Sequence, residues 1–346
     1  MNAAPVSTVA SELAANPHRI RVLPVLVLFP HNRCNCRCVM CNIWRIRQAR
    51  EITARDLEPH LESMRALGVR WVVFSGGEPQ MHTDLPALCR VLRAEGIRLT
   101  LLTAGLLLEP QARSVADTID DVIVSLDGPP EIHDRIRRVP RAFERLTRGV
   151  EALRRLRPTI AIRGRSTVQK ANYKYLRETV RAAKEIGLDS VSFLAADVTS
   201  RAFNRPDGWT PQEQSGVALG TEEARELEDE VEALIRERTE DIAKGYIVED
   251  AGKLRRIARH FRAHLGHVAP VAPRCNAPWV SAVVEADGTV RPCFFHRPLG
   301  NIREKPLLEI LNGVEALDFR ERLDIARDPI CRQCVCSLYL ADSASL

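Results

Sequence analysis

The sequence predicts an α/β fold in which helices cover a parallel sheet. Between residues 22 and 196, short apolar runs alternate with longer amphipathic stretches, giving six β/α units. The apolar runs are nearly continuous, which is typical of strands that are buried on both faces. The stretches between them repeat their apolar residues at helical spacing. Successive units of this kind indicate a parallel sheet covered by helices.

The strands and helices are expected to alternate along the chain. The predicted strands are 22–29, 70–74, 98–103, 121–126, 159–168 and 189–195. The predicted helices are about 53–67, 84–95, 110–117, 141–156 and 174–187. In barrels of such units, functional groups lie on the loops that follow the C-terminal ends of the strands.

Composition excludes several classes of protein. At 346 residues with 45% hydrophobic residues, the chain suits a barrel-sized globular domain with an appendage. The net charge of +5 is spread along the chain, which disfavours a nucleic-acid partner. No run approaches the roughly 18 apolar residues of a membrane span, so we expect no membrane partner. The run at 22–29 follows two arginines as a signal sequence would, but it is short and contains Pro24, and a buried strand is the better interpretation.

The cysteines fall into two tight groups, which indicates metal binding rather than a disulfide framework and suits a reducing cytoplasm. In the first group, Cys34, Cys38 and Cys41 have the spacing C-x3-C-x2-C. Iron–sulfur clusters usually take four cysteines, so three thiolates around a 4Fe–4S cluster leave one iron open. Cys36 is expected not to be a ligand. For this motif alone, the alternatives are a buried cysteine-rich turn or a zinc knuckle.

Two further segments follow predicted strands. They are Ser75-Gly76-Gly77-Glu78-Pro79 after the second strand and Ser125-Leu126-Asp127-Gly128-Pro129 at the end of the fourth. With the cysteine motif, they resemble the radical S-adenosylmethionine (SAM) superfamily. The resemblance implies a partial (β/α)6, TIM-like barrel whose open iron is chelated by the amino and carboxylate groups of SAM. It also implies that an electron from the cluster breaks a carbon–sulfur bond, and that the 5'-deoxyadenosyl radical takes hydrogen from a substrate.

The same resemblance implies which residues bind SAM. The glycine-rich segment recognises the ammonium group through backbone oxygens and the Glu78 side chain. Ser125 contacts the ribose or the carboxylate, and Arg137 pairs with the carboxylate, with Arg135 as the competing candidate. Apolar side chains pack against adenine. The residues expected at SAM are Met40, Gly76, Gly77, Glu78, Pro79, Ser125, Arg137 and Leu194.

The C-terminal section resembles the SPASM/Twitch extension of radical SAM enzymes. Cys275-x12-Gly288-x4-Cys293 and the pair Cys331 and Cys334 carry the resemblance, which implies a second 4Fe–4S cluster with these four cysteines as ligands. This section has five cysteines where the full SPASM pattern needs seven, so a single, Twitch-like auxiliary cluster fits better. Cys336 is a spare thiol or an alternative ligand to Cys334. A structural zinc site made by the same four thiolates is the alternative.

Four regions are expected along the chain. The connector is expected to be helical at about 221–238 and 251–265, and to act as a linker or as a lid over the barrel mouth. A hairpin is expected from Val280–Glu285 and Thr289–Phe295, turning at Asp287 and Gly288. The regions are an N-terminal extension (1–21), the barrel (22–196), the helical connector or lid (197–274) and the small auxiliary iron–sulfur domain (275–346).

The substrate is less well defined by the sequence. The motif begins at residue 34, which leaves no room before it for a peptide-recognition domain, so we expect a small polar substrate such as a sugar, aminocyclitol or nucleoside. Asp197 and Lys170, just past predicted strands, are candidate catalytic residues that would accept a proton or bind substrate. An external electron donor such as flavodoxin or ferredoxin is also expected. The alternatives are a peptide or protein maturase and, in another class, a non-catalytic iron–sulfur electron carrier or zinc-binding module.

Overall fold

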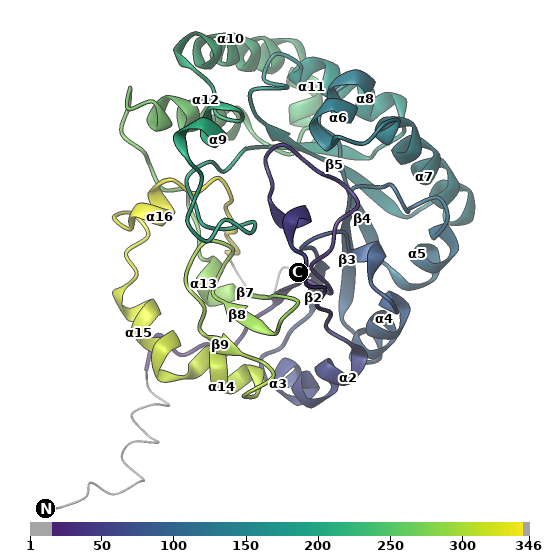
Figure 1. Ribbon diagram of the computed structural model, residues 1–346, viewed down its shortest axis with the longest axis vertical. Coiled ribbons are helices and arrows are strands. Elements are labelled where there is room, and N and C mark those ends of the chain that lie inside the picture. Colours follow the sequence, from purple (N-terminus) through teal and green to yellow (C-terminus); the bar gives the residue numbers. More distant parts are fainter. Residues whose placement is uncertain (1–15, 342–346) are drawn as a thin grey trace, which may run out of the picture.

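The computed structural model describes residues 16–341, and its central element is a single sheet (Figure 1). Six parallel strands stand in the order β6-β5-β4-β3-β2-β1, which confirms the predicted parallel sheet. Each strand lies within one to three residues of its predicted bounds. The strands are β1 (Val25–Leu28), β2 (Trp71–Phe74), β3 (Arg98–Thr103), β4 (Asp121–Ser125), β5 (Ala161–Val168) and β6 (Ser190–Ala195).

Helices cover the outer face of this sheet. The segment predicted at 53–67 is divided into α2 (Ala54–Leu57), η2 (Glu58–His60) and α3 (Leu61–Ala66), and Pro59 lies within the 3-10 turn that separates the two helices. The later helices match the prediction as α4 (Leu85–Ala94), α5 (Ala112–Thr118), α7 (Ala142–Leu156) and α8 (Leu176–Glu185). Short 3-10 turns, η1 (Ile43–Arg45) and η3 (Pro79–Met81), lie in the loops after β1 and β2.

The helix α6 (Pro130–Arg137) was not predicted. It begins with proline at its first position, where the missing N–H costs nothing, and ends with Arg138 in the left-handed region at φ 53°. Because α6 follows β4 directly, it brings Arg137 back to the mouth of the barrel.

The two faces of the strands differ in burial. On β1 and β2, the helix-facing residues Leu26, Leu28, Val72 and Phe74 are fully buried. The residues that alternate with them, such as Val27, face inward and line a cavity of about 530 Å³. The interior of closed TIM barrels is filled with side chains. Here the strands curve only part of the way round, and an open interior remains.

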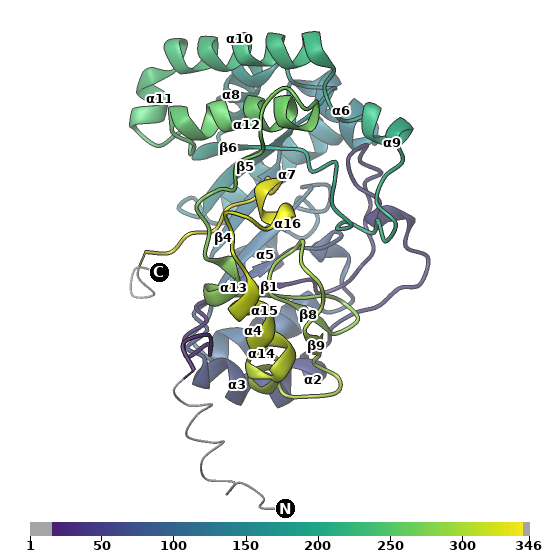
Figure 2. The same cartoon turned by 90° about the vertical axis from the view of Figure 1, so that its left-hand side faces the viewer.

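The connector lies along the β6 edge of the sheet. Its helices are α9 (Pro211–Ser215), α10 (Thr221–Glu237), α11 (Thr239–Ala243) and α12 (Ala251–His264). α10 packs on α8 and α12, and α12 packs on β6, as Figure 2 shows. Val191 of β6 also pairs with Ile247 in a parallel bridge. The connector therefore extends the ring of helices and forms one wall of the interior.

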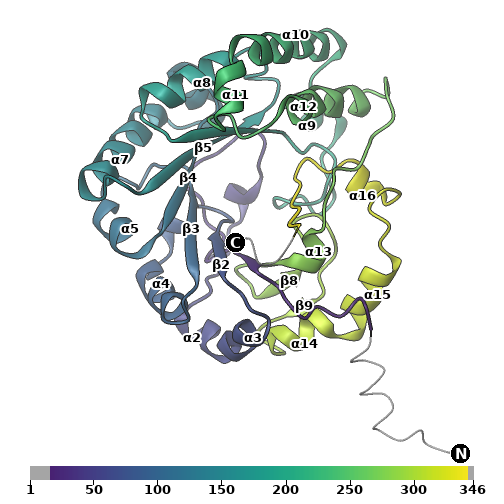
Figure 3. The ribbon, with the colours of Figure 1, turned by 180° about the vertical axis from the view of Figure 1, so that it is seen from behind.

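The C-terminal section closes the other edge of the sheet. The predicted hairpin is present as β7 (Ser281–Val284) and β8 (Thr289–Arg291), with Gly288 at φ +91° in the turn, and β9 (Gly300–Asn301) pairs with β8. In addition, β7 pairs in parallel with β1, so this section continues the main sheet. The remaining helices are α13 (Ala277–Val280), α14 (Leu307–Asn312), α15 (Val314–Arg322) and α16 (Pro329–Arg332). Seen from behind, the sheet, connector and C-terminal helices form one ring (Figure 3).

Two further sequence-based expectations concern the N-terminal extension and membrane-spanning segments. Of the N-terminal extension predicted at 1–21, residues 1–15 lie outside the described residues. Between residues 16 and 341, no helix is both long and apolar enough to cross a membrane.

Candidate active site between two groups of cysteines

The loop after β1 carries the first group of cysteines, and backbone hydrogen bonds hold it against two other predicted site segments. The N–H of Glu78 donates to the carbonyl of Arg33 at 2.8 Å. The N–H groups of Arg37 and Val39 donate to carbonyls near the end of α6, at 3.0 and 3.1 Å. The three motifs that the sequence analysis grouped, far apart along the chain, therefore meet at one end of the barrel.

Gly77 and Gly76 allow this close approach. A Cβ atom at Gly77 would lie 1.9 Å from the carbonyl oxygen of Arg33, well inside any allowed contact. Gly76 has φ +98°, and a Cβ there would lie 2.7 Å from Cγ of Phe29. Only glycine fits both positions. One function of the pair is therefore to let the cysteine loop lie directly on the turn after β2.

The Glu78 carboxylate is buried, with 1% of the residue exposed, and it binds the protein itself. It accepts hydrogen bonds from the Thr103 hydroxyl and the Ala104 N–H, both at 2.8 Å, and from the Gln80 N–H at 3.2 Å. Burial raises the pKa of Glu78, and these donors act against the rise. The carboxylate thus ties the loop after β2 to the end of β3. A carboxylate has about four acceptor positions, and three of them are occupied here. One position therefore remains for the ammonium group of SAM, as predicted.

Arg137 lies beside the cysteine loop, whereas its competitor Arg135 is exposed. The Arg137 guanidinium pairs with Asp127 at 2.5 Å and donates to Sγ of Cys38 at 3.5 Å. Burial disfavours its charge, but Asp127 and Cys38 together raise the pKa of Arg137 above its usual range. Its Nε atom has no hydrogen-bond partner among the described residues. A buried cation with a free donor fits the predicted role of binding a carboxylate.

Cys36 lies between two of the predicted ligands. It is buried, and hydrogen bonding to Cys34 and Cys38 raises the pKa of its thiol. The same contact, aided by Arg137, lowers the pKa of Cys38 to about 7, which favours the thiolate form that binds metal. Burial raises the pKa of Cys41 to about 12, and the neighbouring Cys38 and Cys34 add to the rise. The three thiols of the motif are therefore near neighbours.

These residues fit a 4Fe–4S cluster with SAM, because three neighbouring thiols converge beside a buried arginine that has a free donor. Cys34, Cys38 and Cys41 would hold the cluster, and the bound cluster would supply the electron that cleaves SAM. Met40 packs against Ala196, Val198 and Trp209 just past β6, so this side chain joins the cysteine loop to the opposite side of the mouth.

Asp197, a predicted catalytic residue, is buried just past β6 and is held by charged and polar partners. Its carboxylate pairs with the guanidinium of Arg205 at 2.5 Å and accepts hydrogen bonds from the hydroxyl and the N–H of Ser200. Arg205 is also buried and lies over the ring of Trp209 at 4.3 Å. The carboxylate therefore fixes the loop after β6. The buried cation that pairs with Asp197 lies eight residues further along the chain, and the catalytic role of Asp197 stays a prediction.

The catalytic role of Lys170 also stays a prediction. Lys170 is exposed, and its ammonium group pairs with Glu223 of α10 at 3.4 Å and donates to the carbonyl of Ser215 at 3.3 Å. It is not among the residues that line the interior cavity. Its contacts fasten the connector to the end of β5 on the outside of the molecule.

Replacing Arg205 by alanine is expected to destabilise the protein by about 3–5 kcal/mol, because Asp197 would remain as a buried, unpaired charge. The measurement is the midpoint of thermal unfolding, compared with Arg201→Ala, which removes an exposed arginine from the same loop. The variant with both Asp197→Ala and Arg205→Ala should lose less than the sum of the two single losses. Additive losses would contradict the pairing.

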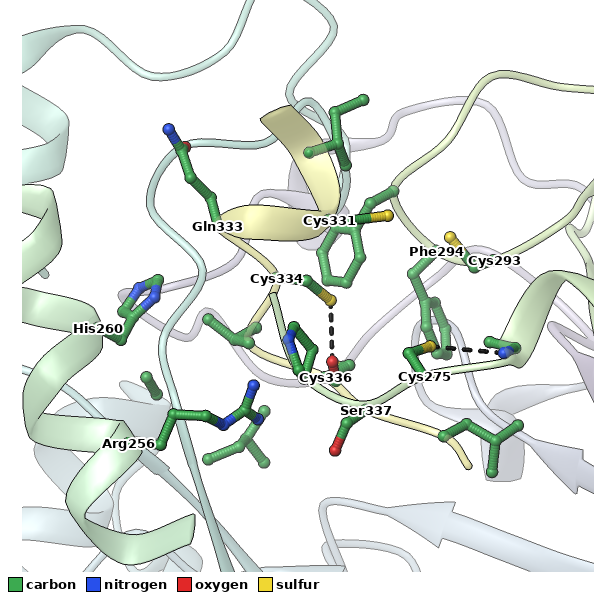
Figure 4. A pocket seen from close by; sticks show the side chains of 18 of the residues that line it. Arg256, His260, Cys275, Cys293, Phe294, Cys331, Gln333, Cys334, Cys336 and Ser337 are labelled. Atoms are coloured by element: carbon green, nitrogen blue, oxygen red, sulfur yellow. Dashed lines mark hydrogen bonds between the residues drawn. The ribbon is translucent and has the colours of Figure 1, made fainter. Parts of the chain in front are cut away.

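The second group of cysteines lies on the opposite wall (Figure 4). The sulfur atoms of Cys275, Cys293, Cys331 and Cys334 face a common space beside Phe294. Burial raises the pKa of Cys331 to about 12, and the neighbouring Cys293 and Cys275 add to this rise. Burial also raises the pKa of Cys334. Such thiols bind metal by releasing their protons, so the set fits a four-cysteine cluster.

Two residues beside this group were missed as candidates. Nε2 of His296 lies 3.3 Å from Sγ of Cys331, and it lies 3.8 Å from a carboxylate oxygen of Asp328. The three ligand atoms lie within 4.8 Å of one another, close enough to hold a metal ion. The signal in the sequence was the position of His296 three residues after Cys293. The fifth thiol, Cys336, lines the cavity, and its carbonyl accepts a hydrogen bond from the Cys334 thiol at 2.9 Å.

The cavity is lined by the second group of cysteines and by residues next to the predicted SAM site. Ser75, next to Gly76, and Leu194 line it near the predicted SAM site, and the second group of cysteines lines its opposite side. Its volume is in the range of about 300–1,000 Å³ that is usual for ligand sites. Cationic side chains line the cavity together with a single acidic one, Glu249. The cationic residues are Arg165, Lys253, Arg256, Arg259 and Arg332.

Two family models match the chain. Residues 28–183 match the radical SAM superfamily, and residues 275–335 match SPASM, an iron–sulfur cluster-binding domain. The chain belongs to the radical SAM superfamily and carries a C-terminal SPASM-type domain. It is therefore an enzyme with a 4Fe–4S cluster, SAM and auxiliary iron–sulfur chemistry, and the alternative of a non-catalytic carrier or zinc module is set aside. The assignment of individual ligands stays a prediction.

Among its relatives, the chain is similar to enzymes of haem metabolism. It is 29% identical to an AdoMet-dependent heme synthase of Methanosarcina barkeri over 84% of this chain and 82% of the relative. It is 26% identical to an Fe-coproporphyrin III synthase of the same organism, over 83% and 73%. The sugar or aminocyclitol substrate expected from the sequence has no support among these relatives.

Solved structures share the fold. SuiB of Streptococcus suis bound to S-adenosylmethionine aligns with a TM-score of 0.65 and 16% identity, over 96% of this chain and 76% of that one. The protein anSMEcpe with bound AdoMet aligns with a TM-score of 0.64 and 20% identity, over 90% and 87%. At this level of identity the likeness concerns the fold alone, and it agrees with the predicted partial barrel.

Proposed function

We propose that this radical SAM enzyme takes hydrogen from a tetrapyrrole that carries carboxylate side chains. The observation that carries the proposal is the interior cavity, which is lined by the second group of cysteines together with five cations and one acid. An excess of positive charge in a partly enclosed cavity attracts a polyanionic ligand. Iron-coproporphyrin has this character, because four carboxylates surround its planar ring.

The apolar part of the cavity supports the same substrate class. Inward-facing residues of β1 to β4 provide a floor of aliphatic and aromatic side chains, which suits the face of a large flat ring. These residues are Val25, Val27, Trp71, Val73, Leu102 and Ile123. A sugar or aminocyclitol would leave much of this surface without a partner. The similarity to a heme synthase and an Fe-coproporphyrin III synthase over most of the chain adds independent support.

The predicted roles of the chain's own residues follow from their positions. Cys34, Cys38 and Cys41 hold the catalytic cluster, and Arg137 and Ser125 hold the carboxylate end of SAM. Met40 and Leu194 pack against its adenine. Electrons come from an external donor such as ferredoxin or flavodoxin. The second group of cysteines, which lines the cavity, would hold the auxiliary cluster, and a cluster there would supply electron transfer to or from the substrate.

The test is anaerobic incubation of the reconstituted enzyme with SAM, dithionite and iron-coproporphyrin III. We expect the tetrapyrrole to raise the rate of 5'-deoxyadenosine formation and to change in mass as 5'-deoxyadenosine accumulates. GTP and an aminocyclitol serve as controls for the other substrate classes. If iron-coproporphyrin III and related carboxylated tetrapyrroles leave the rate unchanged and are recovered intact, the proposal is wrong.

A further inference from the structure

Two arginines that line the cavity, Arg165 and Arg256, form no ion pair with any described residue. Arg165 projects from β5, where its Nε donates to the Ser192 hydroxyl at 3.2 Å, and Arg256 projects from α12. Of the other three cationic residues that line the cavity, two donate hydrogen bonds to backbone carbonyls, namely Arg259 and Arg332. The guanidinium groups of Arg165 and Arg256 therefore keep N–H donors that are available to a ligand.

The two arginines belong to one wall of the cavity. Figure 4 shows Arg256 reaching from α12 toward the second group of cysteines. α12 packs on β6, and β6 pairs with β5 at Arg165, so the two arginines extend from neighbouring elements into the same cavity. Glu249 also lines the cavity, where its carboxylate accepts the N–H of Phe193 at 2.8 Å; burial raises the pKa of Glu249, and the nearby charge of Arg165 opposes this rise without forming an ion pair.

The sheet register relates this wall to the reaction centre. Arg165 pairs with Ser125 of β4 on one side and with Ser192 of β6 on the other. Ser125 is a predicted SAM contact, so a group bound by Arg165 would lie close to the point where the 5'-deoxyadenosyl radical forms. Arg256 lies further toward the auxiliary cysteines.

From this arrangement we infer that Arg165 and Arg256 form a two-arginine clamp that binds a carboxylate side chain of the substrate between the two clusters. The inference rests on the proposed function for the identity of the substrate, but the carboxylate chemistry of the clamp is separate from it. Arginine suits the task because its planar fork binds a carboxylate through two parallel hydrogen bonds. The clamp would orient the side chain so that its hydrogen atoms face SAM.

The test uses the reconstituted holoenzyme with SAM bound and a probe other than the proposed substrate. Benzene-1,2,4,5-tetracarboxylate is a planar polycarboxylate, and its binding is measured by isothermal titration calorimetry. We expect Arg165→Gln and Arg256→Gln each to weaken binding by about tenfold or more. The control is Arg255→Gln, which removes a cation from the same helix that lies outside the cavity and pairs with Glu232. The affinity of this control variant for the probe should stay within about threefold of the affinity of the unmodified protein.

Two outcomes would overturn the clamp. One is a probe that does not bind, or that binds equally well to the double variant and to the unmodified protein. The other is an Arg165→Gln variant that binds the probe normally but cleaves SAM more slowly in the absence of substrate, which would assign Arg165 to SAM. Turnover of iron-coproporphyrin III is measured in parallel. If the protein binds the probe through both arginines but leaves every tetrapyrrole unchanged, the clamp is supported and the proposed substrate is wrong.

Discussion

Replacing Cys34, Cys38 and Cys41 together by alanine is expected to abolish 5'-deoxyadenosine formation while leaving about four irons on each chain. The three thiols converge beside Arg137 in a loop that is held to the turn after β2 and to α6. The second group of cysteines lies across the cavity and is untouched by these substitutions. Iron content, visible absorbance and 5'-deoxyadenosine would be measured on anaerobically reconstituted protein.

Cys36→Ala provides the matched control, since it removes a buried thiol from the same loop. If Cys36 is a bystander, this variant keeps both the full iron content and the activity. Loss of the catalytic cluster in Cys36→Ala would show that the ligand assignment by spacing is wrong. Zinc in place of the remaining iron of the triple variant would identify the second group of cysteines as a structural zinc site.

The parallel sheet could be predicted because local sequence determines it. Strands such as β1 and β2 are short apolar runs whose helix-facing residues are fully buried, and such runs leave a clear pattern along the chain. The pairing of β7 with β1 left no such pattern. It joins segments about 250 residues apart, and nothing within Ser281–Val284 indicates which edge it will meet. The helix α6 was missed for another reason, because the residues Gly128, Pro129 and Pro130 at its start are typical of a loop.

The site residues could be predicted where the chemistry requires a fixed spacing of residues along the chain. Cysteine spacing, the glycine pair and Arg137 lead to groups that the structure brings together at one end of the barrel. Position after a strand was a poorer guide. Asp197 and Lys170 both lie there, yet each is bound by a partner that the sequence did not reveal, Arg205 and Glu223. Arg165 and Arg256 were also overlooked, since a single arginine in a strand or helix has no signature until the cavity is known.

Gly77→Ala is expected to lower 5'-deoxyadenosine formation by about 100-fold, through displacement of the catalytic cysteine loop. The added methyl group would lie 1.9 Å from the carbonyl oxygen of Arg33, which immediately precedes Cys34. Backbone surrounds this position, so the contact cannot be relieved by rotating a side chain. The loop must move away from the turn, and the hydrogen bond from the Glu78 N–H to the Arg33 carbonyl is lost with it.

The effect should be specific to the catalytic end of the molecule. Gly216→Ala is the matched control, because a Cβ there meets its nearest neighbour at 3.4 Å and its φ of −75° suits alanine. Iron counting separates the two clusters: Gly77→Ala should lose catalytic-cluster iron or SAM affinity while the auxiliary iron stays bound. Activity within a few-fold of the unmodified enzyme would mean that the cysteine loop tolerates the displacement. In that case the glycine would not be required for the loop to approach the turn, and its role would be limited to the backbone contact with SAM.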